Sequence, residues 1–286
     1  MAEPSKPRNA LPPGSCDSHA HIFGPADRYR YSPTREYTPP DASRQRFASL
    51  LHHLGFQRAV LVQPSVYGTD NALLVDALRD SASEDLGISW RGVAVVERGV
   101  SDRELETLNQ LGVRGVRLNL VFKGAALDFD GVEQLARRIA PLGWHLQFLV
   151  DITRFEHFAS RLSRLPVPSV VDHMGHFPAK LGPAHPDFRE LLALLREGNT
   201  WVKLSGPNRI SSRDRAPFDD VEPIAQALLA VAPQRLVFGT DWPHVRLSTP
   251  IPDDGVLVDE FFDWIDGDAV LAREILVDNP ARLYGF

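Results

Sequence analysis

The chain has 286 residues, of which 43% are hydrophobic and 24% are charged, and its formal net charge is −6. This composition is that of a globular protein with a sizeable core, and the acidic balance disfavours nucleic acid as a partner because phosphate binding usually leaves a basic surface. The sequence has neither a signal-peptide core nor an apolar run near the roughly 18 residues that span a membrane, so we expect a cytoplasmic protein without membrane contact.

Residues 1–14 are polar and rich in proline, which predicts an extended arm at the start of a single domain that covers residues 1–286. After this arm come eight apolar runs bounded by turn residues, each typical of a buried strand. In chain order the predicted strands are Ser15–Phe23, Arg58–Ser65, Arg91–Val96, Val113–Leu120, Trp144–Val150, Ser169–Met174, Thr200–Ser205 and Arg235–Thr240. The segments between them repeat apolar residues at three- and four-residue spacing, which predicts helices.

Strand and helix therefore alternate about eight times with no break in composition, which is the α/β pattern of a closed parallel (β/α)8 TIM barrel. The strands are nearly continuous apolar runs, as expected when both faces of a sheet are covered. A doubly wound open sheet is the alternative. It usually has fewer strands, and no glycine-rich phosphate loop follows the first strand of this chain.

Two features belong to the first predicted strand and the segment after it. Cys16 is the single cysteine, so no intramolecular disulfide forms, and its place in an apolar strand favours a buried thiol over a nucleophile. Residues Gly24–Pro40 form a long loop rich in tyrosine, arginine and proline. Because long loops in compact domains are usually functional, and this one leaves the carboxyl end of a barrel strand, we expect it to border an active site.

Polar side chains collect at the carboxyl ends of six predicted strands, which in a barrel meet at one rim. His19 and His21 are two residues apart, so both point to the barrel interior, where a buried imidazole needs a metal, a substrate or a hydrogen-bond partner. Asp172 precedes His173 and is expected on the opposite strand face, as a structural carboxylate. The remaining polar residues at this rim are Gln63 and Ser65, Arg117 and Asn119, Lys203 to Arg209, and Asp241 with His244.

The candidate catalytic set is His19, His21, His173 and Asp241. The other histidines are weaker candidates for the catalytic set. His145 opens its strand and is expected at the opposite end of the barrel, whereas His176 and His244 follow key motifs and are candidates for the pocket lining.

A set of motifs in a fixed order then resembles a known family. The motifs are DSHAHIFGP (17–25), YTPPDA (37–42), HLGF (53–56), GTDN (68–71), GVRLN (115–119), VPSVVDHMG (167–175), GTDWPH (239–244), IPDDG (251–255) and NPARLY (279–284). Over nearly the whole chain they resemble the amidohydrolase superfamily, and within it the metal-independent lactonase branch typified by 2-pyrone-4,6-dicarboxylate lactonases.

The resemblance implies an enzyme that hydrolyses a carboxylated lactone. Asp241 is expected to activate water, while His19, His21 and His173 surround the ester carbonyl and donate hydrogen bonds to its oxygen. The expected substrate-binding residues are Ser65, Arg117, Arg209, Lys123, Tyr37 and His244.

Two positions depart from the family pattern. Lys123 stands where the pyrone lactonases have an arginine, so the charge remains but the bidentate fork is lost. Leu149 stands where they have a tyrosine, so a hydrogen-bond donor is lost. The substrate is therefore expected to be 2-pyrone-4,6-dicarboxylate or a close analogue.

Typical members of the superfamily bind one or two divalent ions, and this chain lacks part of that ligand set. The fourth strand offers Arg117 instead of lysine or glutamate, and the fifth ends without a histidine. We expect no metal and no other cofactor. The alternative is one zinc or manganese ion held by His19, His21, His173 and Asp241, since three protein ligands and a water suffice for catalysis.

Three other functions remain open. The first is a sugar-acid lactonase or lactone isomerase, although Asp241 favours water activation over isomerisation. The second is a metal-dependent amidohydrolase or decarboxylase of the same superfamily. The third is an inactive barrel that serves as a binding module, which the intact catalytic set disfavours. A monomer or a homodimer is expected.

Overall fold

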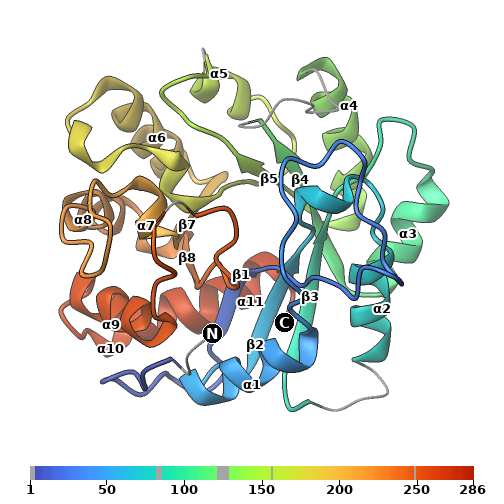
Figure 1. Cartoon of the computed structure of the whole chain (residues 1–286). Coiled ribbons are helices and arrows are strands. Elements are labelled where there is room, and N and C mark those ends of the chain that lie inside the picture. Colours follow the sequence, from blue (N-terminus) through green and yellow to red (C-terminus); the bar gives the residue numbers. More distant parts are fainter. Residues whose placement is uncertain (1–3, 82–85, 121–128, 156, 248) are drawn as a thin grey trace.

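The computed structural model describes residues 4–81, 86–120, 129–155, 157–247 and 249–286. Within them eight parallel strands form one sheet in chain order, with helices around it (Figure 1). The strands are β1 Cys16–Ala20, β2 Arg58–Val62, β3 Ser89–Ala94, β4 Val113–Asn119, β5 His145–Leu149, β6 Ser169–Val171, β7 Thr200–Ser205 and β8 Leu236–Gly239. Each of the eight predicted strands is present.

The sheet closes on itself between its first and last strands. The backbone N–H of His21 donates to the carbonyl of Trp242 at 2.8 Å, and that of Asp241 donates to the carbonyl of His19 at 2.8 Å. These bonds join β1 to the segment after β8 at the carboxyl end of the barrel. The predicted (β/α)8 TIM barrel is therefore confirmed, and the open sheet is excluded.

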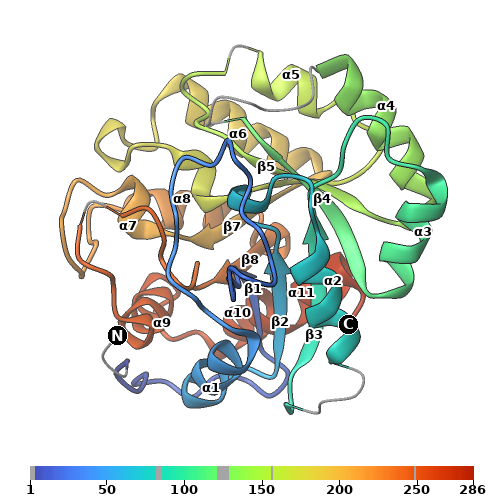
Figure 2. The same cartoon turned by 45° about the vertical axis from the view of Figure 1, so that its right-hand side comes forward.

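The helices lie outside the strands, as the two cartoon views show from different sides (Figures 1 and 2). They are α1 Arg44–Leu54, α2 Ala72–Asp80, α3 Asp102–Gln110, α4 Phe129–Ile139, α5 Phe158–Leu162, α6 Pro186–Glu197, α7 Pro207–Ile210, α8 Glu222–Val231, α9 Asp254–Trp264, α10 Ala269–Arg273 and α11 Asn279–Tyr284. No helix in the described part of the chain is long and apolar enough to cross a membrane.

Helix α1 illustrates how the sequence sets these elements. The Ser43 side chain accepts from the N–H of Arg46 at its start, and Gly55 ends it with a φ of 100°, which glycine adopts without strain. Phe47 and Leu51 repeat at helical spacing and are fully buried. The helix thus covers the sheet with one apolar face.

The amino end of the barrel is packed and apolar. Tyr284 of α11 joins a buried cluster with Cys16 and interior valines of several strands. The His145 ring lies 5.3 Å from the Tyr284 ring, so the expectation that His145 faces this end is confirmed. Cys16 is fully buried and burial raises the pKa of its thiol, as expected for a packing residue.

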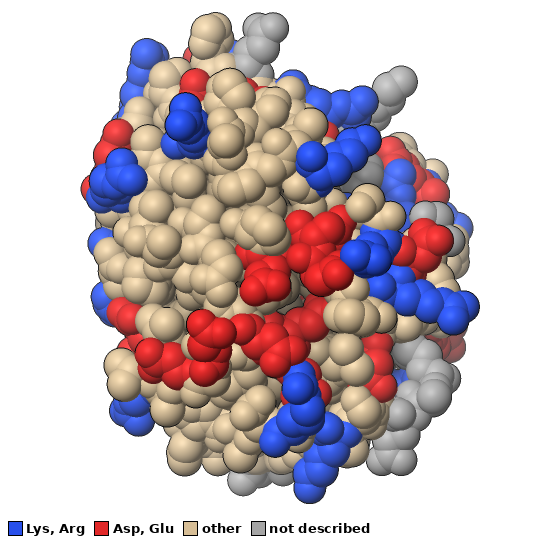
Figure 3. All heavy atoms as spheres, turned by 90° about the vertical axis from the view of Figure 1, so that its left-hand side faces the viewer, with Lys and Arg blue, Asp and Glu red and all other residues tan. Residues whose placement is uncertain are grey.

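The N-terminal segment lies against α9. Ser5 donates from its backbone N–H and its hydroxyl to Asp253, and the guanidinium of Arg8 contacts Asp259 and Asp263. On the side of the molecule at the left of Figure 1, acidic side chains form a band across the surface (Figure 3).

Candidate active site

Two cavities meet at the carboxyl end of the barrel. An inner cavity of about 40 Å³ is lined by His21, Tyr37, Ser65, Arg117, Leu149, His173, His176, Arg209, Asp241, Val245 and Arg246. A larger outer cavity of about 1040 Å³ shares Ser65 and Arg117 with it. Residues 30–36 form part of the outer wall, so the long loop after β1 borders the candidate site as expected.

The four predicted catalytic residues lie together beside the inner cavity. Asp241 Oδ1 is 3.8 Å from His19 Nε2 and 3.7 Å from His173 Nε2, and the His19 and His21 ring centres are 5.0 Å apart. All four side chains are buried. His19 Nε2 and Asp241 Oδ1 have no hydrogen-bond partner among the described residues, which leaves two polar atoms available to a ligand.

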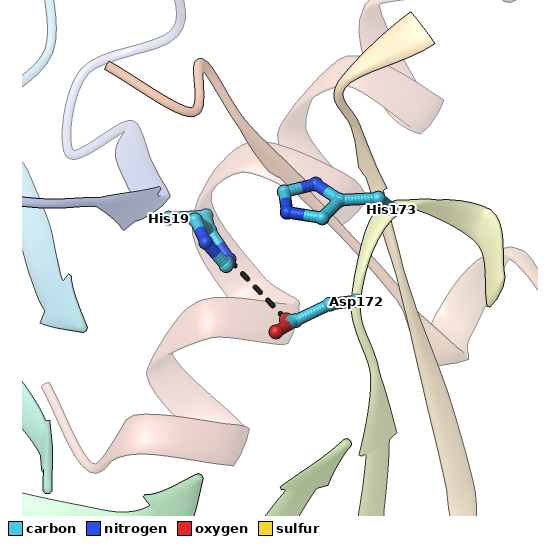
Figure 4. Close-up of side chains that lie close together, drawn as sticks. All are labelled: His19, Asp172 and His173. Carbon is cyan, nitrogen blue, oxygen red and sulfur yellow. Dashed lines mark ion pairs between the residues drawn. The ribbon is translucent and has the colours of Figure 1, made fainter. Parts of the chain in front are cut away.

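Several residues at the site have a left-handed backbone. The φ angles are 50° at His173, 45° at His176, 68° at Asp241, 60° at His244 and 62° at Arg246. Such conformations cost of order 1–3 kcal/mol each in residues other than glycine and concentrate at functional sites. They also explain one wrong expectation: β6 ends at Val171, so strand alternation does not apply, and Asp172 and His173 both contact His19 (Figure 4).

The environment of the histidines keeps them neutral near pH 7. Burial lowers the pKa of His19 to about 4 and lowers the pKa values of His21 and His173 well below the usual value. For Asp241 burial raises the pKa, but the charge of Arg209, and that of the site histidines when they are protonated at low pH, outweigh burial and hold the pKa far below the usual range. The site therefore combines an ionised carboxylate with neutral imidazoles.

The structure corrects the expected role of His21. Its Nδ1 lies 2.7 Å from the carbonyl oxygen of Val62, and because a carbonyl only accepts, Nδ1 carries the proton. In a neutral ring Nε2 then bears a lone pair. His21 is therefore an acceptor toward the cavity and not a donor to a substrate carbonyl.

The predicted substrate-binding arginines are both paired with aspartates. Arg209 Nε lies 2.5 Å from Asp241 Oδ2, so the guanidinium covers one oxygen of the carboxylate. Arg117 Nε lies 3.2 Å from Asp172 Oδ2, while its side chain also lines both cavities. Arg209 is 15% exposed and Arg117 is 6% exposed, so a ligand reaches Arg209 more easily.

Only some of the other predicted binding residues line the cavity. Tyr37 and Ser65 both line the inner cavity. His244 is turned toward α9, where its Nε2 lies 2.7 Å from Asp254 Oδ1, and His176 lines the cavity instead. Lys123 lies outside the described residues.

Sequence reasoning gave too little weight to the interior residues beneath the histidines. Lys203 is fully buried on β7, and its Nζ donates to the Ser18 carbonyl at 2.9 Å and to Gln147 Oε1 at 2.8 Å. Gln147 Nε2 in turn donates to Asp172 Oδ2 at 3.0 Å. A lysine inside an apolar strand was the available signal, because such a charge is almost never fully buried without a partner.

Two groups in the described part of the chain have the spacing of metal ligands. The first is His19, Asp172 and His173, but Arg117 and Lys203 already neutralise Asp172. The second is His19, His21 and Asp241, whose free Nε2 and Oδ1 atoms suit one divalent ion. The cations of Arg117, Lys203 and Arg209 lie close to these carboxylates. Their three positive charges exceed the two negative charges of Asp172 and Asp241, so no net negative charge remains to attract such an ion.

Comparisons with known proteins agree with this geometry. The profile of the family described as Amidohydrolase matches residues 16–286. The chain is 41% identical to a 2-pyrone-4,6-dicarboxylate hydrolase of Comamonas testosteroni, over 99% of this chain and 94% of that protein. It is 36% identical to a 4-sulfomuconolactone hydrolase of Hydrogenophaga intermedia, over 97% and 91% of the two chains.

A solved structure from Acinetobacter baumannii has a similar fold. It is named a probable 2-pyrone-4,6-dicarboxylic acid hydrolase and contains citric acid. It superposes with a TM-score of 0.82 at 28% identity and covers 96% of this chain and 100% of its own.

Proposed function

The chain belongs to the amidohydrolase family, and from this premise we propose that it is a carboxylic-ester hydrolase that opens a carboxylated lactone ring. The leading substrate is 2-pyrone-4,6-dicarboxylate or a close analogue. Two relatives with at least 36% identity are named as hydrolases of lactones that carry anionic groups. One observation carries the proposal. Asp241 Oδ1 has no hydrogen-bond partner among the residues that the structure describes, and it lies within 3.8 Å of two imidazole nitrogens, next to arginines that suit carboxylates.

The reaction begins with a water molecule between Asp241 and the lactone carbonyl carbon. Asp241 takes one proton as the water oxygen bonds to that carbon, and negative charge forms on the carbonyl oxygen. Nε2–H groups of His19 and His173 donate to this oxygen, and each donor of this kind is worth roughly 3 kcal/mol. His21 Nε2 accepts a hydrogen bond from the second O–H group of the water, which keeps that hydrogen. The ring C–O bond then breaks, and Asp241 returns its proton to the leaving oxygen.

Binding of a substrate carboxylate prepares Asp241 for this role. In the ligand-free protein Arg209 covers Asp241 Oδ2, and the inner cavity of about 40 Å³ holds little more than water. A substrate carboxylate draws Arg209 away, which frees Oδ2 and lets the pKa of Asp241 rise toward that of a useful base. Arg117, Ser65 and Tyr37 line the same cavity and complete the anion site.

The apolar part of the lining favours a flat ring over a sugar lactone. Leu149 and Val245 face the inner cavity and offer no hydrogen bonds to the hydroxyls of a sugar acid. Buried hydroxyls without partners would cost affinity. A sugar-acid lactonase and a lactone isomerase are therefore the weaker alternatives.

The proposed reaction is metal-free. Lys203 and Arg209 already supply positive charge beside His19 and Asp241, so a divalent ion would enter against them. If one zinc or manganese ion is bound, His19, His21 and Asp241 are the residues that hold it, and it would supply Lewis-acid polarisation of the carbonyl. Unchanged turnover after chelation, with no stoichiometric metal by elemental analysis, is the expected result.

A substrate panel tests the proposal. Ring opening of 2-pyrone-4,6-dicarboxylate is followed by the loss of its ultraviolet absorbance, and the same protein is given 4-sulfomuconolactone and several aldonolactones. We expect turnover of the planar, anionic rings and little of the aldonolactones. Turnover of the aldonolactones alone would contradict the proposed substrate class.

A further inference from the structure

Lys203 is the most deeply buried cation of the site and has no part in the reaction as proposed so far. Its side chain is fully buried, so it cannot touch a substrate. Its Nζ makes three short contacts, to the Ser18 carbonyl at 2.9 Å, to Gln147 Oε1 at 2.8 Å and to His19 Nδ1 at 3.2 Å. An ammonium group has three hydrogens, and here each has one acceptor.

This arrangement determines where the His19 proton lies. A lysine ammonium donates and never accepts, so the ring nitrogen that it contacts must present a lone pair. A protonated imidazolium would carry a hydrogen on both nitrogens, so a ring whose Nδ1 accepts is neutral and carries one proton. With Nδ1 occupied as an acceptor, that proton is on Nε2, which faces Asp241 Oδ1 at 3.8 Å.

We propose that Lys203 is a positioning residue that fixes His19 in the Nε2–H tautomer, and so makes it a hydrogen-bond donor toward the cavity. The catalytic consequence rests on the proposed lactone hydrolysis. There the Nε2–H of His19 is one of the donors to the carbonyl oxygen. His21 has the opposite tautomer because Val62 holds its Nδ1–H, so the His-x-His pair supplies one donor and one acceptor.

Asp172 competes with Lys203 for a hydrogen bond with His19 Nδ1. Its Oδ1 lies 3.2 Å from His19 Nδ1, and this contact is the one marked in Figure 4. Its other oxygen is already bonded to Arg117 and Gln147, whereas Oδ1 has no hydrogen-bond partner of good geometry in the described part of the chain. Lys203 Nζ lies 3.6 Å from this Oδ1. Without Lys203, Asp172 Oδ1 would accept a hydrogen bond from a protonated Nδ1, and the Nδ1–H tautomer would be favoured instead.

The test is the ¹⁵N NMR spectrum of histidine-labelled protein at pH 7 without substrate. The His19 signals are assigned by their loss in His19→Gln. In the wild-type protein we expect His19 with a bare Nδ1 and a protonated Nε2. A protonated Nδ1 in the wild-type protein would overturn the proposal before any lysine variant is made.

Lys203→Met removes the donor and the charge while it keeps a similar length. We expect the His19 proton to move to Nδ1, and kcat for the lactone to fall about 100-fold with KM nearly unchanged, as for loss of one oxyanion donor. Lys180→Met, at an exposed lysine, is the matched control and should change neither quantity.

The two readouts separate the possible results. A fall in kcat with an unmoved His19 tautomer would show that Lys203 is merely structural and would overturn the proposal. If wild-type protein turned over no lactone, the proposed function would fail, yet the tautomer shift would still decide the role of Lys203. If Lys203→Met did not fold, a protonated Nδ1 in the wild-type spectrum would still overturn the proposal.

Discussion

The rim of the active site and the floor beneath it each contain one buried aspartate, but they hold it differently. Asp241 at the rim is paired with one cation, Arg209, whose guanidinium borders the cavity, and one carboxylate oxygen is unpartnered within the described chain. Asp172 on the floor lies among Arg117, Lys203 and Gln147, two of them bonded to the same oxygen. At the rim, Arg209 can leave Asp241 for a substrate carboxylate. On the floor, the contacts of Asp172 stay in place when a substrate binds.

This contrast separates reactivity from preorganisation. A group that must take up and release a proton needs a partner that can leave. The groups that orient it need fixed hydrogen bonds, because donors that are already in place cost no reorganisation during the reaction. Changes at the rim should therefore alter kinetics with little effect on folding, and changes on the floor should alter both.

Asp241→Asn is expected to have the largest kinetic effect. The amide keeps the shape but cannot take a proton from water, so kcat should fall at least about 10³-fold while the fold is retained. Steady-state kinetics and circular dichroism measure the two parts. Asp151→Asn is the matched control, since Asp151 also follows a barrel strand but bonds to Thr153. Near-normal turnover in Asp241→Asn would remove the base from the mechanism.

Arg209→Met tests whether the guanidinium at the rim binds a substrate carboxylate. Its loss removes a charged hydrogen bond to a substrate carboxylate, so kcat/KM should fall about 100-fold, mainly through KM. Asp241 loses its closest cation in the same variant. The low-pH limb of the rate profile should therefore move to higher pH, because the positive charge that lowers the pKa of Asp241 is gone. An unchanged KM for a dicarboxylate lactone would contradict this role.

Asp172→Asn makes the same chemical change on the floor. It leaves Arg117 and Lys203 buried without their shared carboxylate, so the free energy of unfolding should fall by about 3 kcal/mol. Burial raises the pKa of Asp172, but His19, Lys203 and Arg117 outweigh it and hold the pKa well below the usual value. The wild-type carboxylate therefore stabilises the fold above about pH 4, and this contribution is lost as pH falls. Denaturant titrations at pH 7 should show a larger loss than in Asp241→Asn.

The sequence was sufficient to predict the fold and to predict that His19, His21, His173 and Asp241 lie together. Apolar runs and polar strand ends are local patterns, and they led to the barrel, to His19 and to Asp241. The buried residues beneath the rim were harder to predict, because the role of Lys203 on β7 depends on acceptors of two other strands, Ser18 and His19 of β1 and Gln147 of β5. The tautomer of His21 likewise depends on a carbonyl of β2, which no spacing within the first motif reveals.

His145 extends the comparison to the amino end of the barrel. Burial lowers its pKa to about 3, whereas an unfolded histidine titrates near 6.5. Between these values the unfolded chain takes up a proton that the folded chain refuses, so stability should fall as pH drops from about 6.5 to 3. This uptake makes the free energy of unfolding change by up to about 1.4 kcal/mol per pH unit, and in His145→Gln that part of the pH dependence should disappear. Above pH 7 the difference in free energy of unfolding between the wild-type protein and His145→Gln should be constant.

Ser65→Ala and Ser205→Ala compare one hydroxyl at the rim with one behind it. Ser65 lines both cavities, so its loss should raise KM about fivefold and leave kcat unchanged, as for one neutral hydrogen bond. The Ser205 hydroxyl lies 2.9 Å from His173 Nδ1 and is buried. Its loss should therefore lower kcat and spare KM, because it orients an imidazole and does not bind the substrate. If both variants changed KM alone, the division between an exchanging rim and a fixed floor would not hold.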